Sequence, residues 1–207
     1  TQTGKQCHHG CETFQRMSDC IMPREGVFRR VLRGGEIAVG DEMHLVYKVG
    51  IITASDKGAA GAREDRSGPA IAARLPDDYQ VVCTEIVPDD RAKLAEVLRR
   101  MCDEQGCNLV LTTGGTGFSP RDVTPEATRD VIERETPGLA EAIRAYSMQF
   151  TRRAMLSRGV SGIRGRTLIV NLPGSPKAVQ ESMDAFLDTV GHGLRLLLNT
   201  DGECART

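Results

Sequence analysis

The segment from Leu111 to Thr128 gathers residue types that suit the binding of an anion next to a metal ion. It reads LTTGGTGFSPRDVTPEAT, so an apolar run leads directly into three glycines within four residues. A backbone without side chains can approach an anion closely and point its amide groups at it. Thr116 and Ser119 add hydroxyl groups, and Arg121 adds a cation. Asp122 adds a carboxylate that could hold Mg²⁺ beside a triphosphate.

A tight turn that leads into a helix N-cap is the other interpretation of this segment. The segment lacks the lysine of the P-loop pattern, and its glycines do not fit G-x-G-x-x-G. Two common nucleotide-binding motifs are therefore excluded. The segment alone does not decide between an anion cradle and a plain turn.

Carboxylates also follow the apolar runs at 49–53 and 80–87, where Asp56 and Asp89 stand. One helix cap explains one such residue and contributes about 1 kcal/mol of helix stability. Together with Asp122, however, these residues make three carboxylates at strand ends on one side of a predicted sheet. Capping alone does not require that arrangement, so we interpret them as a candidate site.

The sequence NLPGSPK at 171–177 offers a further phosphate-binding position. It follows an apolar run and combines small residues with the start of a helix. Helix N-termini bind anions because their first amide groups have no partner within the helix.

These residues need elements that bring the strand ends together. Short, nearly continuous apolar runs predict strands at 49–53, 80–87, 108–113 and 167–172. Start signals predict helices that begin at Ser67, Asp89, Thr124, Pro137 and Ser175. The first is expected to run through Leu75, the third through Ile132, and the last to be long. This alternation predicts an α/β fold, a mostly parallel sheet with helices on both faces, with ligands beyond the carboxyl ends of the strands.

Residues 1–45 differ from the rest of the chain in amino-acid composition and in the length of their predicted strands. They are rich in Gly, Cys and Arg, and they contain short strand-like pieces at 27–32 and 36–39 with Gly34-Gly35 as a turn between them. We therefore predict two parts, residues 1–45 and residues 46–207.

Composition excludes several classes of function. Lys and Arg number 27 against 28 Asp and Glu, aromatic residues make up 4%, and Trp is absent, which argues against a nucleic-acid-binding protein. No apolar run approaches the roughly 18 residues of a membrane span, and no signal peptide is recognisable. The seven unevenly distributed cysteines fit reduced thiols. We expect a cytoplasmic protein that binds no membrane.

Several motifs in the second part resemble one known family. They are DRSG at 65–68, VPD at 87–89, the segment at 112–128, ERETPG at 133–138, MLSR at 155–158, GIRG at 162–165 and NLPG at 171–174. Residues 48–200 thereby resemble the molybdopterin adenylyltransferases, which include bacterial MogA, MoaB and the G domains of gephyrin and plant Cnx. The resemblance implies an α/β homotrimer that joins ATP, as co-substrate with Mg²⁺, to molybdopterin and releases pyrophosphate. It also implies a partner enzyme that inserts molybdate into the adenylated pterin.

The resemblance assigns roles to individual residues. Asp89 and Asp122 fall on the two essential carboxylates and are the expected catalytic residues and metal ligands. The expected substrate-binding residues are Ser55, Asp56, Gly114, Gly115, Thr116, Gly117, Ser157, Asn171, Pro173, Gly174, Ser175 and Lys177. The terminal phosphate of the pterin is already a nucleophile, so transfer needs in-line positioning and charge neutralisation rather than a covalent enzyme intermediate.

Residues 1–45 resemble the C-terminal third of a MOSC domain, a family that handles sulfur in the same pathway. The resemblance rests on GKQCHHGC at 4–11, DCIMPREG at 19–26 and the segment at 34–42. A fusion of two pathway steps and a remnant of a longer gene both fit this segment. A zinc site formed by Cys7, His8, His9, Cys11 and Cys20 matches the usual spacing only in part.

Two rival functions from other classes stand beside the transferase. A non-catalytic molybdopterin-binding or scaffold trimer of the MoaB or gephyrin type would use the same fold without turnover. A sulfur-carrying or metal-binding protein would work through the N-terminal cysteines. The sequence does not distinguish a molybdenum pathway from a tungsten pathway.

Overall fold

The computed structural model describes residues 2–3, 27–28, 36, 38, 40 and 45–200. The chain divides into two compact units, Thr1–Met43 with Arg195–Thr207, and His44–Leu194. In the first unit, strands β1 (Gln2–Thr3) and β2 (Val27–Phe28) pair antiparallel. The predictions for the turn at Gly34-Gly35, for the N-terminal zinc ligands and for most of the MOSC-like segment lie outside the described residues.

The second unit is built on a mixed sheet with the strand order β4-β3-β5-β8-β7-β6. Its parallel part consists of β3 (Tyr47–Ala54), β4 (Tyr79–Val87), β5 (Leu109–Thr113) and β8 (Thr167–Leu172). All of these strands are confirmed to within two residues of their predicted bounds. The sequence did not indicate the antiparallel edge, which consists of β7 (Ser161–Arg164) and β6 (Arg134–Glu135). Both strands are short, and both residues of β6 are exposed.

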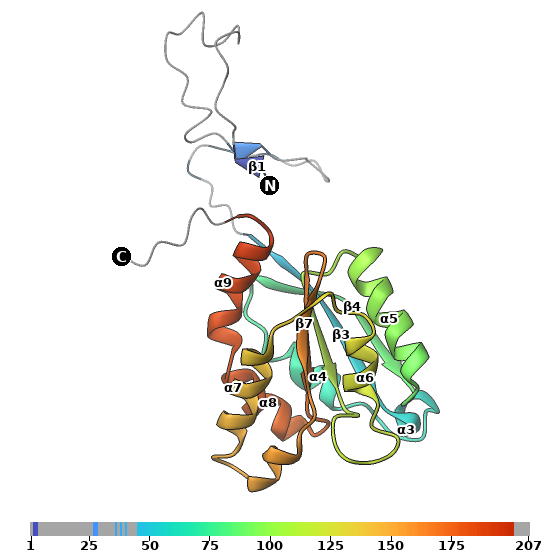
Figure 1. The fold of residues 1–207 in the computed structure, drawn as a ribbon. Coiled ribbons are helices and arrows are strands. Elements are labelled where there is room, and N and C mark those ends of the chain that lie inside the picture. The colour runs from blue at the N-terminus through green and yellow to red at the C-terminus, as the bar shows by residue number, and fades with distance from the viewer. Residues whose placement is uncertain are drawn as a thin grey trace, which may run out of the picture. The chain divides into compact units, whose positions relative to one another are not determined.

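Helices cover both faces of this sheet (Figure 1). On one face lie α5 (Arg91–Asp103) and α6 (Thr124–Arg129). On the other lie α4 (Ser67–Ala72), α7 (Pro137–Ser147), α8 (Pro176–Asp184) and α9 (Leu187–Leu197). A short helix α3 (Asp56–Ala59) and a 3-10 turn (Arg152–Leu156) complete the elements from 45 to 200. The predicted α/β architecture is confirmed.

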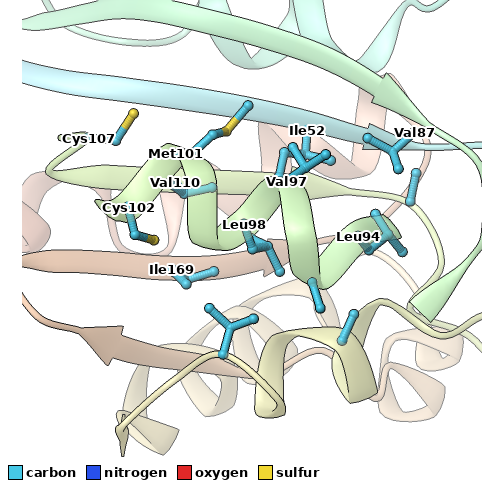
Figure 2. Close-up of a cluster of buried hydrophobic side chains, with 14 residues drawn as sticks. Ile52, Val87, Leu94, Val97, Leu98, Met101, Cys102, Cys107, Val110 and Ile169 are labelled. Carbon is cyan, nitrogen blue, oxygen red and sulfur yellow. The ribbon is translucent and has the colours of Figure 1, made fainter. Parts of the chain in front are cut away.

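The central strands are buried because helices pack on both of their faces. Every residue of β5 and β8 is buried, so these strands show no alternation of apolar and polar residues. Figure 2 shows one half of the core, in which α5 lies across the sheet and inserts Leu94, Leu98 and Met101 against Val110 and Ile169. Those three helix residues recur at helical spacing and are fully buried.

Several predicted helix ends were wrong, each for a visible reason. Asp90, not Asp89, caps α5, because its backbone is extended and its carboxylate accepts the amide of Lys93 at 3.0 Å. Ser67 lies inside α4 instead of capping it, and its hydroxyl donates to the carbonyl oxygen of Gly174 at 2.8 Å. This bond ties α4 to the loop after β8.

Three helices also differ in extent from the prediction. The helix that starts at Ser67 ends at Ala72 and the one that starts at Thr124 ends at Arg129, both short of their predicted ends. The last predicted helix is two helices, α8 and α9, which meet around Phe186. Phe186 is 1% exposed, so its burial at this break anchors both helices to the core. Among the described residues, no helix has the length and apolar character that a membrane crossing requires.

Candidate active site

A pocket of about 570 Å³ opens at the carboxyl ends of β3 and β5. The chain places β4 on one side of β3 and β5 on the other, with α4 and α5 on opposite faces. Such a reversal of strand order leaves a crevice, and it is where open α/β sheets bind their ligands. The pocket is lined by Thr53, Ala54, Ser55, Gly58, Arg63, Glu64, Asp65, Arg66, Ser67, Asp89, Thr113, Gly114, Gly115, Asp122, Gly174 and Pro176.

Two glycines of the loop after β5 are required by the backbone itself. Gly114 has φ +91°, and a Cβ there would lie 2.4 Å from the carbonyl oxygen of Ala54. Gly115 has φ +63°, and a Cβ there would lie 2.3 Å from Thr124 Oγ1 and 3.2 Å from Asp89 Oδ1. Both conformations favour glycine, and the missing side chains let the loop close against β3 and Asp89. Thr124 Oγ1 is buried at this point without a hydrogen-bond partner.

Arg158 holds the same loop from the opposite side. Its guanidinium donates to the carbonyl oxygen of Gly117 at 2.7 Å and to that of Asp122, and it forms an ion pair with Glu126 at the start of α6. Its own amide donates to the carbonyl oxygen of Thr116 at 2.9 Å. One side chain therefore fixes both ends of the segment between the glycines and Asp122.

Two carboxylates hold the ends of β3 and β4 together. The amide of Asp56 donates to Asp89 Oδ2, and the amide of Asp89 donates to Asp56 Oδ1, each at 3.0 Å. Arg121 donates to both oxygens of Asp56, at 3.0 and 2.8 Å. The sequence suggested Arg121 as a cation that binds the anionic ligand. In the structure its guanidinium is paired with Asp56 instead.

The two carboxyl groups of this pair have opposite pKa shifts. Hydrogen bonding from Arg121 lowers the pKa of Asp56. Burial raises the pKa of Asp89, and the negative charges of Asp56 and Asp122 act in the same direction. Asp89 is thus a half-buried carboxylate whose ionised form is disfavoured unless a cation binds beside it.

Asp122 and Asp65 are two further carboxylates of the pocket. Asp122 Oδ2 accepts the amide of Ser119 at 2.9 Å, and a Cβ on Gly117 would lie 2.8 Å from the same oxygen. Asp65 accepts the hydroxyl of Thr53 at 2.8 Å and the amides of Ser67 and Gly68 at 2.9 and 3.1 Å. Asp65 therefore joins the end of β3 to the start of α4.

The donors of this pocket fit Mg²⁺ that arrives with a phosphate ligand. The described residues contain no group of three or more His, Cys, Asp or Glu side chains that could hold a metal ion by themselves. Mg²⁺ is commonly bound by one or two carboxylates together with substrate phosphates. Asp89 and Asp122 can supply that pair, and the raised pKa of Asp89 is the effect expected where a cation is needed.

The structure brings about half of the predicted site residues together. Ser55, Asp89, Gly114, Gly115, Asp122 and Gly174 line the pocket. Thr116, Gly117, Ser157 and Pro173 instead line a second cavity of about 240 Å³, whose wall is mostly apolar and includes Ile143 and Leu156. The glycine loop lies between the two cavities, because its residues contribute to both.

The remaining predicted residues line neither cavity. The amide of Asn171 is buried and donates to the hydroxyls of Thr112 and Thr128, each at 2.9 Å, so it supports the loop from the core. Ser175 caps α8, and Lys177 is exposed with Glu181 3.8 Å away. Asp56 stands beside the pocket, where it holds Asp89.

Sequence reasoning missed the loop before α4. Arg63, Glu64, Asp65 and Arg66 line the pocket, yet only the motif at 65–68 was noted, and no role was given to it. The ion pair between Arg66 and Glu64 is 3.0 Å long and almost fully exposed, with side chains 77% and 74% accessible. A pair so exposed contributes little to stability. Arg66 and Arg63 are therefore cations at the pocket rim that could turn to a bound anion.

Comparison with known proteins places the matched region over the sheet and its helices. Residues 50–192 match the family described as probable molybdopterin binding domain. A curated relative, the molybdopterin adenylyltransferase of Haemophilus influenzae, is 42% identical over 156 residues, which are 73% of this chain and 79% of that protein.

Solved structures give the same result. The molybdopterin biosynthesis enzyme MoaB of Thermus thermophilus superimposes with a TM-score of 0.71 at 49% identity, and the match covers 74% of this chain and 98% of that one. The tungsten cofactor synthesizing protein MoaB of Pyrococcus furiosus gives a TM-score of 0.66 at 37% identity, over 73% of this chain and 97% of that one.

Proposed function

The chain belongs to the probable molybdopterin binding domain family that contains MogA and MoaB, and from this premise we propose that it adenylylates molybdopterin. The reaction joins the AMP part of ATP to the terminal phosphate of the pterin and releases pyrophosphate. The observation that carries the proposal is the pocket in which Asp89 and Asp122 meet the glycine loop at the switch point of the sheet.

ATP is assigned to the pocket between β3 and β5. The pocket is polar and of a volume suited to a nucleotide-sized ligand. Its carboxylates repel a bare triphosphate, so the phosphate charge has to be balanced. Arg63 and Arg66 at the rim can balance this charge, because the ion pair between Arg66 and Glu64 is more exposed than the pair between Arg121 and Asp56 and can exchange its partner more readily.

The pterin is assigned to the second cavity, on the other side of the glycine loop. Its wall combines apolar surface with the hydroxyl groups of Thr116 and Ser157, which suits a flat ring with polar edges. With one substrate on each side of the loop, the terminal phosphate of the pterin would meet the α-phosphate of ATP beside Gly115 and Asp122.

The residues of the chain then act by binding and orientation. Asp89 and Asp122 would hold Mg²⁺, which would neutralise phosphate charge when bound. Gly114 and Gly115 line the pocket and carry no side chains, so phosphates can approach the backbone of the loop closely. The amide of Asp56 orients Asp89, and the amide of Ser119 orients Asp122, so that neither carboxylate needs to reorganise during the reaction.

The assembly and partners follow from the same premise. We infer a homotrimer, which a mass measurement in solution tests. An adenylated pterin is an activated intermediate, so a molybdate-inserting enzyme is the expected partner that consumes it. Cytoplasmic location and the functional value of the MOSC-like residues 1–45 stay predictions.

One assay tests the activity directly. The protein is incubated with molybdopterin, ATP and Mg²⁺, and the adenylated pterin and pyrophosphate are measured in parallel. Equal amounts of both products are expected, and omission of Mg²⁺ is expected to abolish both. Tight binding of molybdopterin without pyrophosphate release would overturn the transferase and would support the non-catalytic scaffold instead.

A further inference from the structure

Three sulfur atoms converge away from the active site, in the core between β3, β4 and α5. A Cβ built on Gly50 of β3 would lie 2.8 Å from Met101 Sδ and 3.2 Å from the Sγ atoms of both Cys83 and Cys107. The two Sγ atoms are 3.6 Å apart. Figure 2 shows Met101 and Cys107 extending their sulfur-bearing ends toward β3. Cys83, Met101 and Cys107 together form the sulfur cluster.

An irregularity of the sheet creates the cluster. The pairing of β3 with β4 shifts between Val49 and Gly50, so that Val49 pairs with Val81 but Gly50 pairs with Cys83. Val82 is the extra residue of this bulge, and the shift sets Cys83 beside Gly50. Because glycine carries no side chain, the three sulfurs can approach its Cα from three elements. Any side chain at Gly50 would fill the space that they share.

The chemistry of the cluster suits a soft monovalent metal ion. Thiolate and thioether sulfur together select Cu(I) over harder cations. With metal–sulfur bonds of about 2.3 Å, two sulfurs around a three-coordinate ion lie about 4 Å apart, close to the spacing of Cys83 and Cys107. Structural zinc requires four ligands. In the part of the chain that the structure describes, no set of three His, Cys, Asp or Glu side chains surrounds this point.

We propose that Cys83, Cys107 and Met101 form a three-sulfur binding site for one Cu(I) ion. Each cysteine that binds exchanges its thiol proton for the metal and releases that proton to solvent, and the Met101 thioether binds unchanged. No oxidation state changes. The site connects β4, α5 and the loop before β5, so the bound ion would stabilise the packing of α5 on the sheet without touching the substrate pocket.

The surroundings of the cluster are compatible with this role. Cys83 is half-buried on β4, an edge strand, and offers the ion a way in, whereas Cys107 and Met101 are 2% and 0% exposed. Arg100 and Glu85 act on Cys83 with opposite charges, and Lys48 acts on Cys107 with positive charge. Burial raises the pKa of Cys107 to about 12, which keeps its thiol protonated and unreactive toward disulfide exchange until a metal displaces the proton.

Anaerobic titration of the full chain with Cu(I), in competition with a coloured Cu(I) chelator, tests the proposal. Cys7, Cys11, Cys20 and Cys204 are replaced by Ser in every sample, so that only Cys83, Cys102 and Cys107 remain. One Cu(I) per chain is expected, with about three sulfur neighbours by X-ray absorption and a higher melting temperature than the copper-free protein.

Variants of the cluster identify the ligands. Cys83→Ser is expected to lose the tight site, and Met101→Leu to bind at least tenfold more weakly with two sulfur neighbours. Cys102→Ser is the matched control, because Cys102 is buried next to Met101 on α5 but its sulfur is not one of the three nearest the Gly50 position. Met101→Leu conserves volume and is expected to keep the fold, so it decides the question even where Cys83→Ser unfolds. Unchanged stoichiometry and affinity in Met101→Leu would overturn the proposal.

Discussion

The two ends of the same parallel strands differ in what their residues do. At the carboxyl ends, β3, β4 and β5 lead into carboxylates, glycines and hydroxyl groups around an open pocket. Toward the amino ends, the same strands carry sulfur and aliphatic side chains that pack against α5. The carboxyl end concentrates like charges at a cost in stability, and the packed end supplies the free energy of unfolding that offsets this cost.

Asp89 and Leu98 illustrate the difference. Asp89 is half-buried with other carboxylates nearby, which raises its pKa and makes its ionised form costly in the folded protein. Leu98 is 0% exposed and packs between the sheet and α6. Substitutions at the carboxyl end should therefore lower activity more than stability, and substitutions at the packed end should lower stability more than activity.

The largest effect is expected at Asp122. Asp122→Ala should lower the adenylation rate by about 10²-fold or more, because the carboxylate is assigned to metal and triphosphate. The melting temperature and pterin affinity should change little. Asp130→Ala is the control, since Asp130 forms a surface ion pair with Arg91 outside the pocket. A near-normal rate in Asp122→Ala would remove this residue from the mechanism.

Asp89→Asn should lose activity to a similar degree without losing stability. The folded-state pKa of Asp89 is raised, so its contribution to stability is greatest below the unfolded pKa and is lost as pH rises through the folded pKa. At pH 7 the neutral Asn side chain therefore avoids the cost of burying an ionised carboxylate at position 89. Its side-chain oxygen can still accept the amide of Asp56. Thermal unfolding at pH 7 should give a melting temperature equal to or above that of the wild type. A clear decrease would contradict the raised pKa.

Leu98→Ala tests the packed end of the sheet. Removal of this side chain should lower the free energy of unfolding by about 2–5 kcal/mol, because it leaves a cavity between α5 and its neighbours. The KM values for ATP and molybdopterin should stay unchanged at a temperature where the variant is folded. Urea unfolding measures the first effect and steady-state kinetics the second. A large change in KM would show that the two ends are coupled.

Two glycines with the same backbone conformation distinguish the effect of backbone strain from the effect of a side chain in the pocket. Gly106 and Gly115 both have φ +63°, but a Cβ on Gly106 meets nothing within 4 Å, whereas one on Gly115 meets Thr124 Oγ1 at 2.3 Å. Gly106→Ala should cost about 1 kcal/mol from strain alone. Gly115→Ala should cost more and should also weaken binding of Mg²⁺–ATP. Calorimetric titration of both variants checks this, and equal affinities would contradict the anion cradle.

The smallest effect is expected from removal of residues 1–45. The T. thermophilus structure is matched over 98% of its length by 74% of this chain, so the transferase motifs have their counterparts without this segment. Adenylation rate and oligomer mass of the shortened protein should equal those of the full chain. Loss of either would show that the segment belongs to the working unit.

The local chemistry of the sequence was enough to predict the strands and the residues at their ends. Continuous apolar runs gave β3, β4, β5 and β8 within two residues, because strands covered on both faces must be apolar throughout. Glycines and carboxylates after those runs line the pocket, since all parallel strands deliver their carboxyl ends to one edge. The family and its reaction were also recognisable from short motifs alone.

Only the tertiary structure decided which polar residues face the pocket and which hold it together. Asp89 lines the pocket instead of capping a helix, because its carboxylate accepts the amide of Asp56, which is itself paired with Arg121. Asn171 was predicted to bind substrate, but its side-chain amide donates to Thr112 and Thr128. No role was predicted for Arg158, which fixes the glycine loop. Each of these outcomes depends on hydrogen bonds between segments far apart in sequence. Residue type and spacing determine what a side chain can do, whereas its partner is determined only when the strands and loops pack.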